Sequence, residues 1–105
     1  MVMARKSPLE SVVQRKAIKW MEDQGHYVIK ITLANKSGTP DLIVCTMNDG
    51  KFFAIEVKRK GLKRNVTKIQ QHHINLINKT GGKAIVADCL EDVQALFGMS
   101  LDFLD

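Results

Sequence analysis

Residues 38–58 read GTPDLIVCTMNDGKFFAIEVK, and this stretch decides the fold that the sequence predicts. It holds two apolar runs with the β-branched and aromatic composition of strands. The turn signal Asn-Asp-Gly at residues 48–50 predicts that the runs pair as a tight antiparallel hairpin. Charged residues stand at the strand ends, where a buried charge without a partner is costly. We therefore expect Asp41, Glu56 and Lys58 to act together.

The loop between the two strands decides whether these side chains lie on one face. Side chains alternate along a strand, so Glu56 and Lys58 share a face, about 7 Å apart. A two-residue turn at 49–50 puts Asp41 opposite Lys58, and one at 48–49 puts Asp41 opposite Glu56. Both even loops bring Asp41 to the face of Glu56, whereas a three-residue loop sends it to the other face. The Asp-Gly dipeptide favours an even loop.

Two convergent carboxylates and a strand-end carbonyl would form a set of hard oxygen ligands. Such ligands suit Mg²⁺ or Mn²⁺, which keep waters and accept phosphate oxygens. We expect Asp41, Glu56 and the backbone carbonyl of Val57 to hold the ion, with Lys58 orienting water or stabilising charge on a phosphate. The predicted chemistry is metal-dependent hydrolysis of a phosphodiester. The alternative is an Asp–Lys pair across the strands, with Glu56 in solvent.

The positive charge of the chain is concentrated directly after this hairpin. Residues 58–68 hold six cations and no acid, whereas the rest of the chain holds ten cations and eleven acids. Beside a metal site, such a segment is typical of a phosphate-binding surface, although a solvated loop is the alternative. The residues predicted to contact DNA are Lys36, Arg59, Lys60, Lys63, Arg64 and Lys68.

The remaining sequence completes one domain of 105 residues. Ser7 to Glu10 predicts a capped helix start, with Leu9 on the apolar face, and Gly25 ends that helix. Thr67 and Gln70 predict a second capping box. We predict strands at 27–33, 41–47, 51–58 and 84–87, a helix from Thr67 to Gly81 and another at 90–97, with a basic arm at 1–6 and a tail at 98–105. The order is α-β-β-β-α-β-α, which predicts an α/β fold with a mixed sheet flanked by helices.

Several classes of protein do not fit the sequence. No apolar run reaches about 18 residues, and the basic N-terminal residues lack the apolar segment of a secretory signal. Cys45 and Cys89 are expected to be buried free thiols, which predicts a cytoplasmic rather than a secreted protein. Their spacing from the histidines does not fit zinc, and no glycine-rich loop for a nucleotide cofactor is present.

The order of these motifs resembles a known nuclease family. G-T-P-D at residues 38–41 followed by E-V-K at residues 56–58 resembles the PD-(D/E)xK signature. Over about residues 7–97 the chain is similar to the VRR-NUC (virus-type replication-repair nuclease) domain, including the basic segment and Thr67-x-x-Gln70. The resemblance implies the restriction-endonuclease-like fold, metal ligation as above and Lys58 as the catalytic lysine. It also implies that Glu10 and Gln70 belong to the active site.

The resemblance further implies a substrate and a partner. Free-standing members, mostly from bacteria and their viruses, are similar to Holliday-junction resolvases and act as homodimers, whereas members fused to larger proteins cut flaps. We therefore expect a homodimeric, Mg²⁺- or Mn²⁺-dependent endonuclease for branched DNA that serves repair or recombination in a bacterial or virus-infected cell. The alternatives are a flap-type or general DNA nuclease, or a DNA-binding module without catalysis.

The roles of Glu10 and Gln70 stay open at this point. Each stands three positions after a Ser or Thr, where capping boxes place Glu or Gln. Capping explains either residue as well as catalysis does. The two roles compete for Glu10, because a carboxylate bonded to its own N-cap amide is poorly placed to approach a metal.

Overall fold

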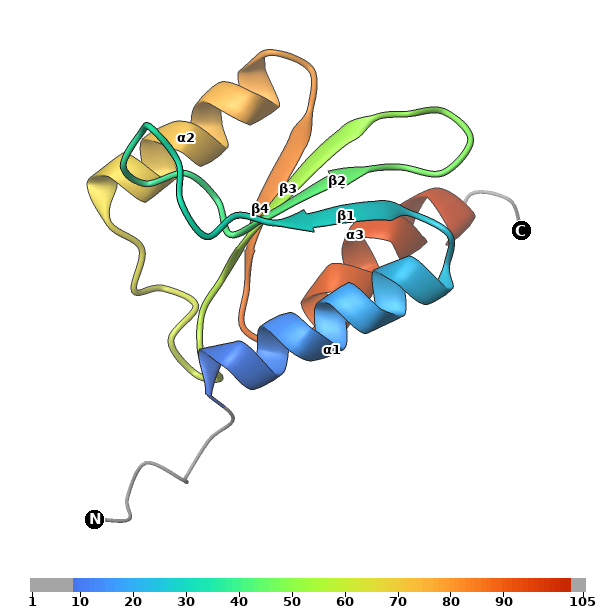
Figure 1. Cartoon of the computed structure of the whole chain (residues 1–105), viewed down its shortest axis with the longest axis horizontal. Helices are drawn as coiled ribbons and strands as arrows, with labels where there is room; N and C mark the ends of the chain where they lie inside the picture. The colour runs from blue at the N-terminus through green and yellow to red at the C-terminus, as the bar shows by residue number, and fades with distance from the viewer. Residues whose placement is uncertain (1–8, 103–105) are drawn as a thin grey trace.

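The computed structural model of the chain describes residues 9–102, and the predicted arm at 1–6, the predicted cap Ser7 and the last tail residues lie outside the described residues. The elements are α1 (Glu10–Asp23), β1 (Tyr27–Lys30), β2 (Leu42–Cys45), β3 (Phe52–Val57), α2 (Lys68–Lys79), β4 (Lys83–Ala87) and α3 (Leu90–Asp102). The predicted order and mixed sheet are confirmed (Figure 1). Part of the predicted tail, residues 98–102, is helical instead and extends α3.

The four strands form one sheet in the order β1-β2-β3-β4. The pairs β1–β2 and β2–β3 are antiparallel, whereas β3 and β4 are parallel and are joined through α2. Helices α1 and α3 cover one face of the sheet and α2 covers the other, as Figure 1 shows. The contacts of α2 are with β3 and β4, so among the described helices none covers β1 and the outer part of β2 on that face.

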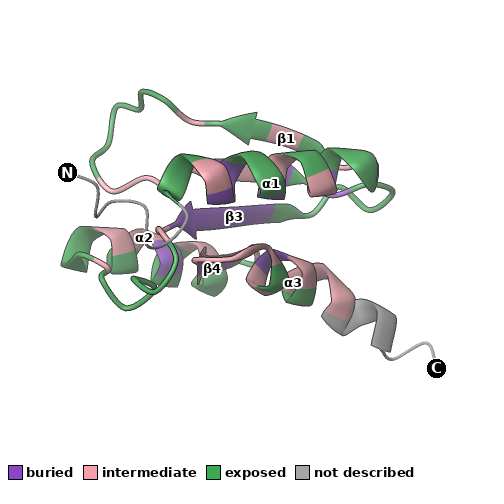
Figure 2. Cartoon of the chain, turned by 90° about the horizontal axis from the view of Figure 1, so that it is seen from below, coloured by how far each residue is buried: buried purple, intermediate pink, exposed green. Residues whose placement is uncertain are grey.

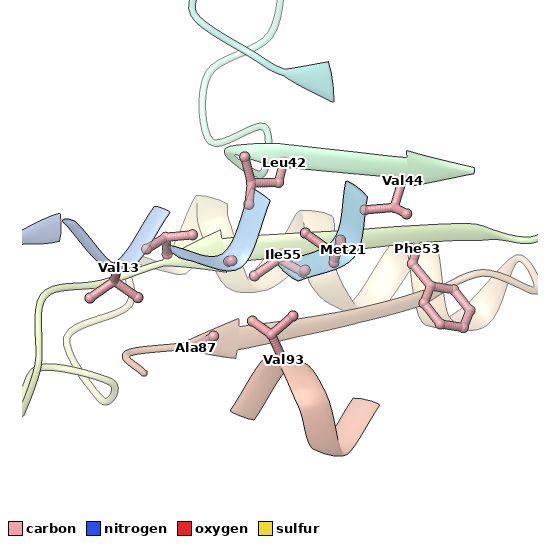
Figure 3. Packing of buried hydrophobic residues seen from close by; sticks show 10 residues of the cluster. Val13, Met21, Leu42, Val44, Phe53, Ile55, Ala87 and Val93 are labelled. Atoms are coloured by element: carbon pink, nitrogen blue, oxygen red, sulfur yellow. The ribbon is translucent and has the colours of Figure 1, made fainter. Parts of the chain in front are cut away.

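The larger core lies between the sheet and the pair α1 and α3. Alternate residues of β2 and β3 point into it, and Figure 2 shows that β3 is buried except at its start. One helical stripe of α1 packs onto them. Figure 3 shows this cluster, which contains Val13, Ala17, Met21, Leu42, Val44, Phe53, Ile55, Val57, Ala87 and Val93. A smaller core of Ala54, Ile74 and Ala84 lies under α2.

The hairpin between β2 and β3 closes with an even loop. Pairing runs from Leu42 opposite Ile55 to Cys45 opposite Phe52, and the Thr46 amide donates to the Lys51 carbonyl at 3.0 Å. Residues 47–50 therefore form a four-residue loop. The Thr46 hydroxyl organises it, because it donates to Asp49 at 2.6 Å and accepts from the Lys51 amide at 2.8 Å. This register is the one that a turn at 48–49 predicts.

Some expectations about burial and capping are wrong. Helix α1 has Leu9 as its N-cap without a side-chain hydrogen bond, so Glu10 is its first residue and not the third helical residue that the predicted capping box requires. Leu9 is exposed rather than part of the core. Cys45 is also exposed, because α2 does not extend over its end of the sheet, and Cys89 is only half-buried.

Among the described helices, none combines the length and apolar character that a membrane span requires.

Candidate functional site

Asp41 occupies the position just beyond the paired part of β2. The ladder to β3 ends at Leu42 opposite Ile55, and the Asp41 carboxylate accepts a hydrogen bond from the Val57 amide at 2.7 Å. The side chain thus satisfies a donor that a further β2 residue would otherwise pair. The approach to Asp41 is fixed by Gly38, whose φ of +81° and close packing against Ile69 of α2 leave little room for a Cβ atom.

Glu56 and Lys58 meet Asp41 at this end of the sheet. Glu56 is only 5% exposed, and Lys58 Nζ lies 3.7 Å from its Oε2. Burial, and after it the charge of Asp41, raises the pKa of Glu56 to about 8, although Lys58 opposes the shift. The two carboxyl groups lie within hydrogen-bonding reach of each other. The even loop therefore has the predicted consequence, because Asp41 and Glu56 share a face.

The carbonyl of Val57 lies on the side of β3 that faces Asp41. In an extended strand the amide and carbonyl of one residue point toward the same neighbour. The Val57 amide donates to Asp41, whereas the next amide, that of Lys58, donates to Ala87 beyond β4 at 2.8 Å. The Val57 carbonyl therefore projects past the end of β2, toward the two carboxyl groups.

Gln70 links the start of α2 to this group. Its Oε1 accepts hydrogen bonds from the Thr67 amide at 3.1 Å and from Lys58 Nζ at 2.9 Å. The Gln70 amide in turn donates to the Thr67 hydroxyl at 3.2 Å, which completes the predicted capping box. A single amide oxygen therefore caps the helix and holds Lys58, so capping and contact with the site do not compete for Gln70.

Glu10 faces the same group from the first turn of α1, which begins beside the end of β3 (Figure 1). Burial and the charge of Asp41 raise its pKa, while Lys58 lowers it. The Glu10 carboxylate does not lie close enough to those of Asp41 and Glu56 to form a third ligand of one shared ion. Among the described residues, the three-residue group whose ligand atoms lie within 4.8 Å of one another is Asp88, Cys89 and Asp92 instead.

The chemistry of this site fits a divalent cation. Two carboxyl groups and a backbone carbonyl converge, and a single lysine amine lies within 4 Å of the buried one. The raised pKa of Glu56 means that this lysine does not stabilise a second negative charge beside Asp41, so Glu56 keeps its proton at neutral pH. Asp41, Glu56 and the Val57 carbonyl offer the hard oxygen atoms that Mg²⁺ and Mn²⁺ prefer.

The predicted DNA-binding residues lie around this end of the molecule and differ in exposure and in ion pairing. Lys36, Lys60, Arg64 and Lys68 are exposed, and Arg59 is half-buried. Lys63 and Arg64 line a surface hollow of about 670 Å³ with Gly61, Leu62, Asn65 and Asp88. Lys63 is paired with a carboxylate of α3, Asp92, which the sequence did not point to.

Asp88, just before α3, and Asp92, in its first turn, are the site-related residues that sequence reasoning missed. Asp88 accepts a hydrogen bond from the Gly61 amide at 3.0 Å, and Asp92 pairs with Lys63 at 2.8 Å. Both partners belong to the basic segment after Lys58. Acidic residues in the first turn of a helix have an ordinary electrostatic explanation, so no local signal marks them.

The pKa of Glu56 predicts how stability depends on pH. Between pH 4.5 and about 8 the unfolded chain has lost this proton while the folded chain keeps it. The free energy of unfolding should therefore fall as the pH rises through this range and level off above it. Glu56→Gln lacks the titration, so it should gain stability over the wild type from pH 5 to pH 8 by at least about 1 kcal/mol, the equivalent of one pKa unit.

The measurement is denaturant unfolding at both pH values in EDTA, which keeps divalent cations from compensating the charge. Glu22→Gln, on the exposed side of α1, is the matched control. Its free energy of unfolding should change with pH in the same way as that of the wild type. A constant difference between wild type and Glu56→Gln across the range would contradict the raised pKa.

The chain is similar to a known protein family and to solved structures. The model of the VRR-NUC domain family matches residues 10–90. A solved structure described as a VRR_NUC domain aligns with a TM-score of 0.72 and 27% identity over 87% of this chain and 96% of that one. Another, described as a VRR_NUC domain protein, aligns with a TM-score of 0.72 and 23% identity over 92% of this chain and 91% of that one. No curated protein matches the chain significantly.

The family match spans more than half of the chain and includes Glu10, Asp41, Glu56, Val57, Lys58 and Gln70. The solved structures share the arrangement of a mixed sheet between helices over nearly their whole length. The chain therefore belongs to the VRR-NUC domain family and is a nuclease domain of the restriction-endonuclease-like fold.

Proposed function

We propose that the chain is a metal-dependent endonuclease that hydrolyses phosphodiester bonds of DNA at Asp41, Glu56 and Lys58. The observation that carries the proposal is that Asp41 meets the Glu56–Lys58 pair at the end of β3, directly before the basic segment. Clustered carboxylates repel phosphate when no cation is bound, so a module that only binds DNA has no use for them.

Each residue of the site has a distinct task in this proposal. Asp41, Glu56 and the Val57 carbonyl would hold Mg²⁺ or Mn²⁺, and the bound ion would supply Lewis-acid chemistry to the phosphate and to the attacking water. Lys58 donates to the phosphate and stabilises the negative charge that develops there. Gln70 fixes the direction of the Lys58 amine, because its oxygen accepts from Nζ at 2.9 Å. Glu10 orients water at the rim of the site. No covalent intermediate forms.

The exposed cations bring the DNA backbone to the site. The exposed Lys36, Lys60, Lys63, Arg64 and Lys68 contact phosphates on either side of the scissile bond, together with the half-buried Arg59. These contacts are independent of sequence, so the shape of the DNA decides what is cut. We infer that the preferred substrate is branched DNA, in particular a four-way junction, which two linked active sites could cut in paired strands. A flap or a plain duplex is the alternative substrate.

The second active site of this proposal comes from a second copy of the chain. No described helix covers the sheet face beyond α2, and we call its exposed residues Tyr27, Ile29, Cys45 and Phe52 the open sheet face. Three of them form one row across the sheet, because Tyr27 pairs with Cys45 and Cys45 pairs with Phe52, and Ile29 lies in the next row on the same face. Apolar patches of this kind mark interaction sites.

Charge favours a second copy rather than DNA as the occupant of the open sheet face. The sheet contains two lysines, Lys30 of β1 and Lys83 of β4. Each pairs with a residue that points to the opposite face, so neither lysine lies on the open sheet face. A phosphate backbone requires cations, whereas two chains of net charge +5 associate best through uncharged surfaces. The open sheet face lies away from the site end of the sheet, so a dimer formed through it would leave both sites accessible.

Cleavage assays test the proposed activity. The protein is incubated with a four-way junction, a flap and a linear duplex in Mg²⁺, Mn²⁺ or EDTA. We expect metal-dependent cleavage, with the junction cut fastest, and loss of at least about a hundredfold in rate for Asp41→Ala and Lys58→Ala. DNA that is bound but stays intact under every condition would favour the non-catalytic alternative. Preferred cutting of the flap would redirect the substrate assignment.

Variants of the two capping-box residues of α2 separate the capping role of Gln70 from its contact with Lys58. Thr67→Ala and Gln70→Ala each remove part of the cap, so each should lower the free energy of unfolding by about 1 kcal/mol. Only Gln70→Ala also removes the acceptor of Lys58, so it should reduce the cleavage rate well beyond Thr67→Ala. Chemical denaturation and cleavage at saturating DNA provide the two measurements. Equal rates in the two variants would limit Gln70 to capping.

Sedimentation equilibrium tests the dimer. Phe52 and Leu62 are similarly exposed, at 47% and 44%, but only Phe52 belongs to the open sheet face. We expect the wild type and Leu62→Glu to be dimers, and Phe52→Glu to be monomeric, because a buried unpaired charge opposes association. A monomeric wild type at tens of micromolar, or a dimeric Phe52→Glu, would rule out this interface.

A further inference from the structure

The basic segment is not uniformly available to DNA, because Lys63 is already engaged. Its Nζ lies 2.9 Å from Oδ1 and 2.8 Å from Oδ2 of Asp92, in the first turn of α3. The lysine side chain is 46% exposed and the aspartate 22%. An incoming phosphate can therefore reach the amine, while the carboxylate stays against the protein.

Asp92 keeps a partner of its own when the lysine leaves. Its Oδ2 also accepts a hydrogen bond at 3.1 Å from the amide of Asp88, which lies just before α3. The loop is held separately, because the Asp88 carboxylate accepts from the Gly61 amide at 3.0 Å. The exchange of partners by Lys63 thus requires no rearrangement of the backbone and no unsatisfied carboxylate.

We propose that Asp92 competes with DNA phosphate for Lys63 and thereby holds down the affinity of the basic segment for DNA; this inference rests on the proposed function. The hollow between Lys63, Arg64 and Asp88 is where a phosphate would displace the carboxylate. An approaching phosphate gains contact with Lys63 only by taking it from Asp92. DNA whose backbone does not reach the hollow leaves the Lys63–Asp92 pair intact, and it therefore binds more weakly.

The competition has a measurable signature in the salt dependence of binding. Each phosphate neutralised by a free cation contributes about 0.9 to the slope of log K against log salt. A lysine that must leave a carboxylate contributes less. Removing the charge of Asp92 should therefore steepen the slope by up to about 0.9. The affinity at low salt should rise about two- to fivefold, the range that corresponds to an exposed ion pair.

The variants Asp92→Asn and Glu91→Gln form a matched pair for this test. Both remove one negative charge from the first turn of α3, but only Asp92 is bonded to Lys63. Asparagine keeps an oxygen for the Asp88 amide, so the start of the helix is preserved. Binding of a fluorescent four-way junction is measured by anisotropy in EDTA, between about 50 and 200 mM salt.

We expect Asp92→Asn to show the tighter binding and steeper slope, and Glu91→Gln to stay close to the wild type. Equal changes in the two variants would reduce the effect to general electrostatics and overturn the inference. A second comparison does not depend on the stability of one variant. Lys63→Gln should weaken binding more in the Asp92→Asn background than in the wild type, and equal losses in both backgrounds would also overturn the competition.

The outcome is separable from that of the proposed function. If the wild type binds and cuts the junction while Asp92→Asn behaves like Glu91→Gln, only the competition for Lys63 fails. If the wild type binds no DNA at any salt concentration, the proposed function and this inference both fail.

Discussion

The hydrogen bond from the Val57 amide to the Asp41 carboxylate is the interaction on which both the sheet end and the site depend. At 2.7 Å it closes the β2–β3 ladder where backbone pairing stops. The same bond brings a negative charge to the face that carries Glu56, so the geometry that completes the sheet also creates a repulsion between carboxyl groups. Strand pairing across the rest of the hairpin has to outweigh this repulsion.

The protein limits the cost of this repulsion without removing it. Glu56 keeps its proton at neutral pH, and Lys58 offsets part of the remaining charge. The lysine is itself held by Gln70, whose position is set by Thr67 at the start of α2. A site that remains electrostatically incomplete in the absence of a cation is what a binding site for one requires, because the missing charge becomes binding free energy.

Local signals in the sequence predict most of this arrangement. The order of elements, the capping box of α2 and the even hairpin loop follow from residues close together in the chain. Which even loop forms is decided by the Thr46 hydroxyl and its two hydrogen bonds, and turn propensities do not contain that information. The exposure of Cys45 and the pairing of Lys63 with Asp92 depend on how far α2 extends and where α3 lies. These are tertiary properties that no periodicity reports.

Glu10 and Gln70 illustrate the limit most directly, because the same spacing has opposite outcomes. Thr67 adopts an extended backbone and caps α2, so Gln70 takes the third helical position of a complete box. Leu9 occupies the N-cap of α1, so Glu10 becomes the first helical residue and its carboxylate is not drawn to a capping amide. A neutral amide oxygen can accept hydrogen bonds from the first turn of a helix and from a lysine at the same time. The charge of a carboxylate in a capping box would instead be offset by the backbone amide that donates to it. The absence of that box in α1 therefore leaves the charge of Glu10 directed at Asp41 and Lys58.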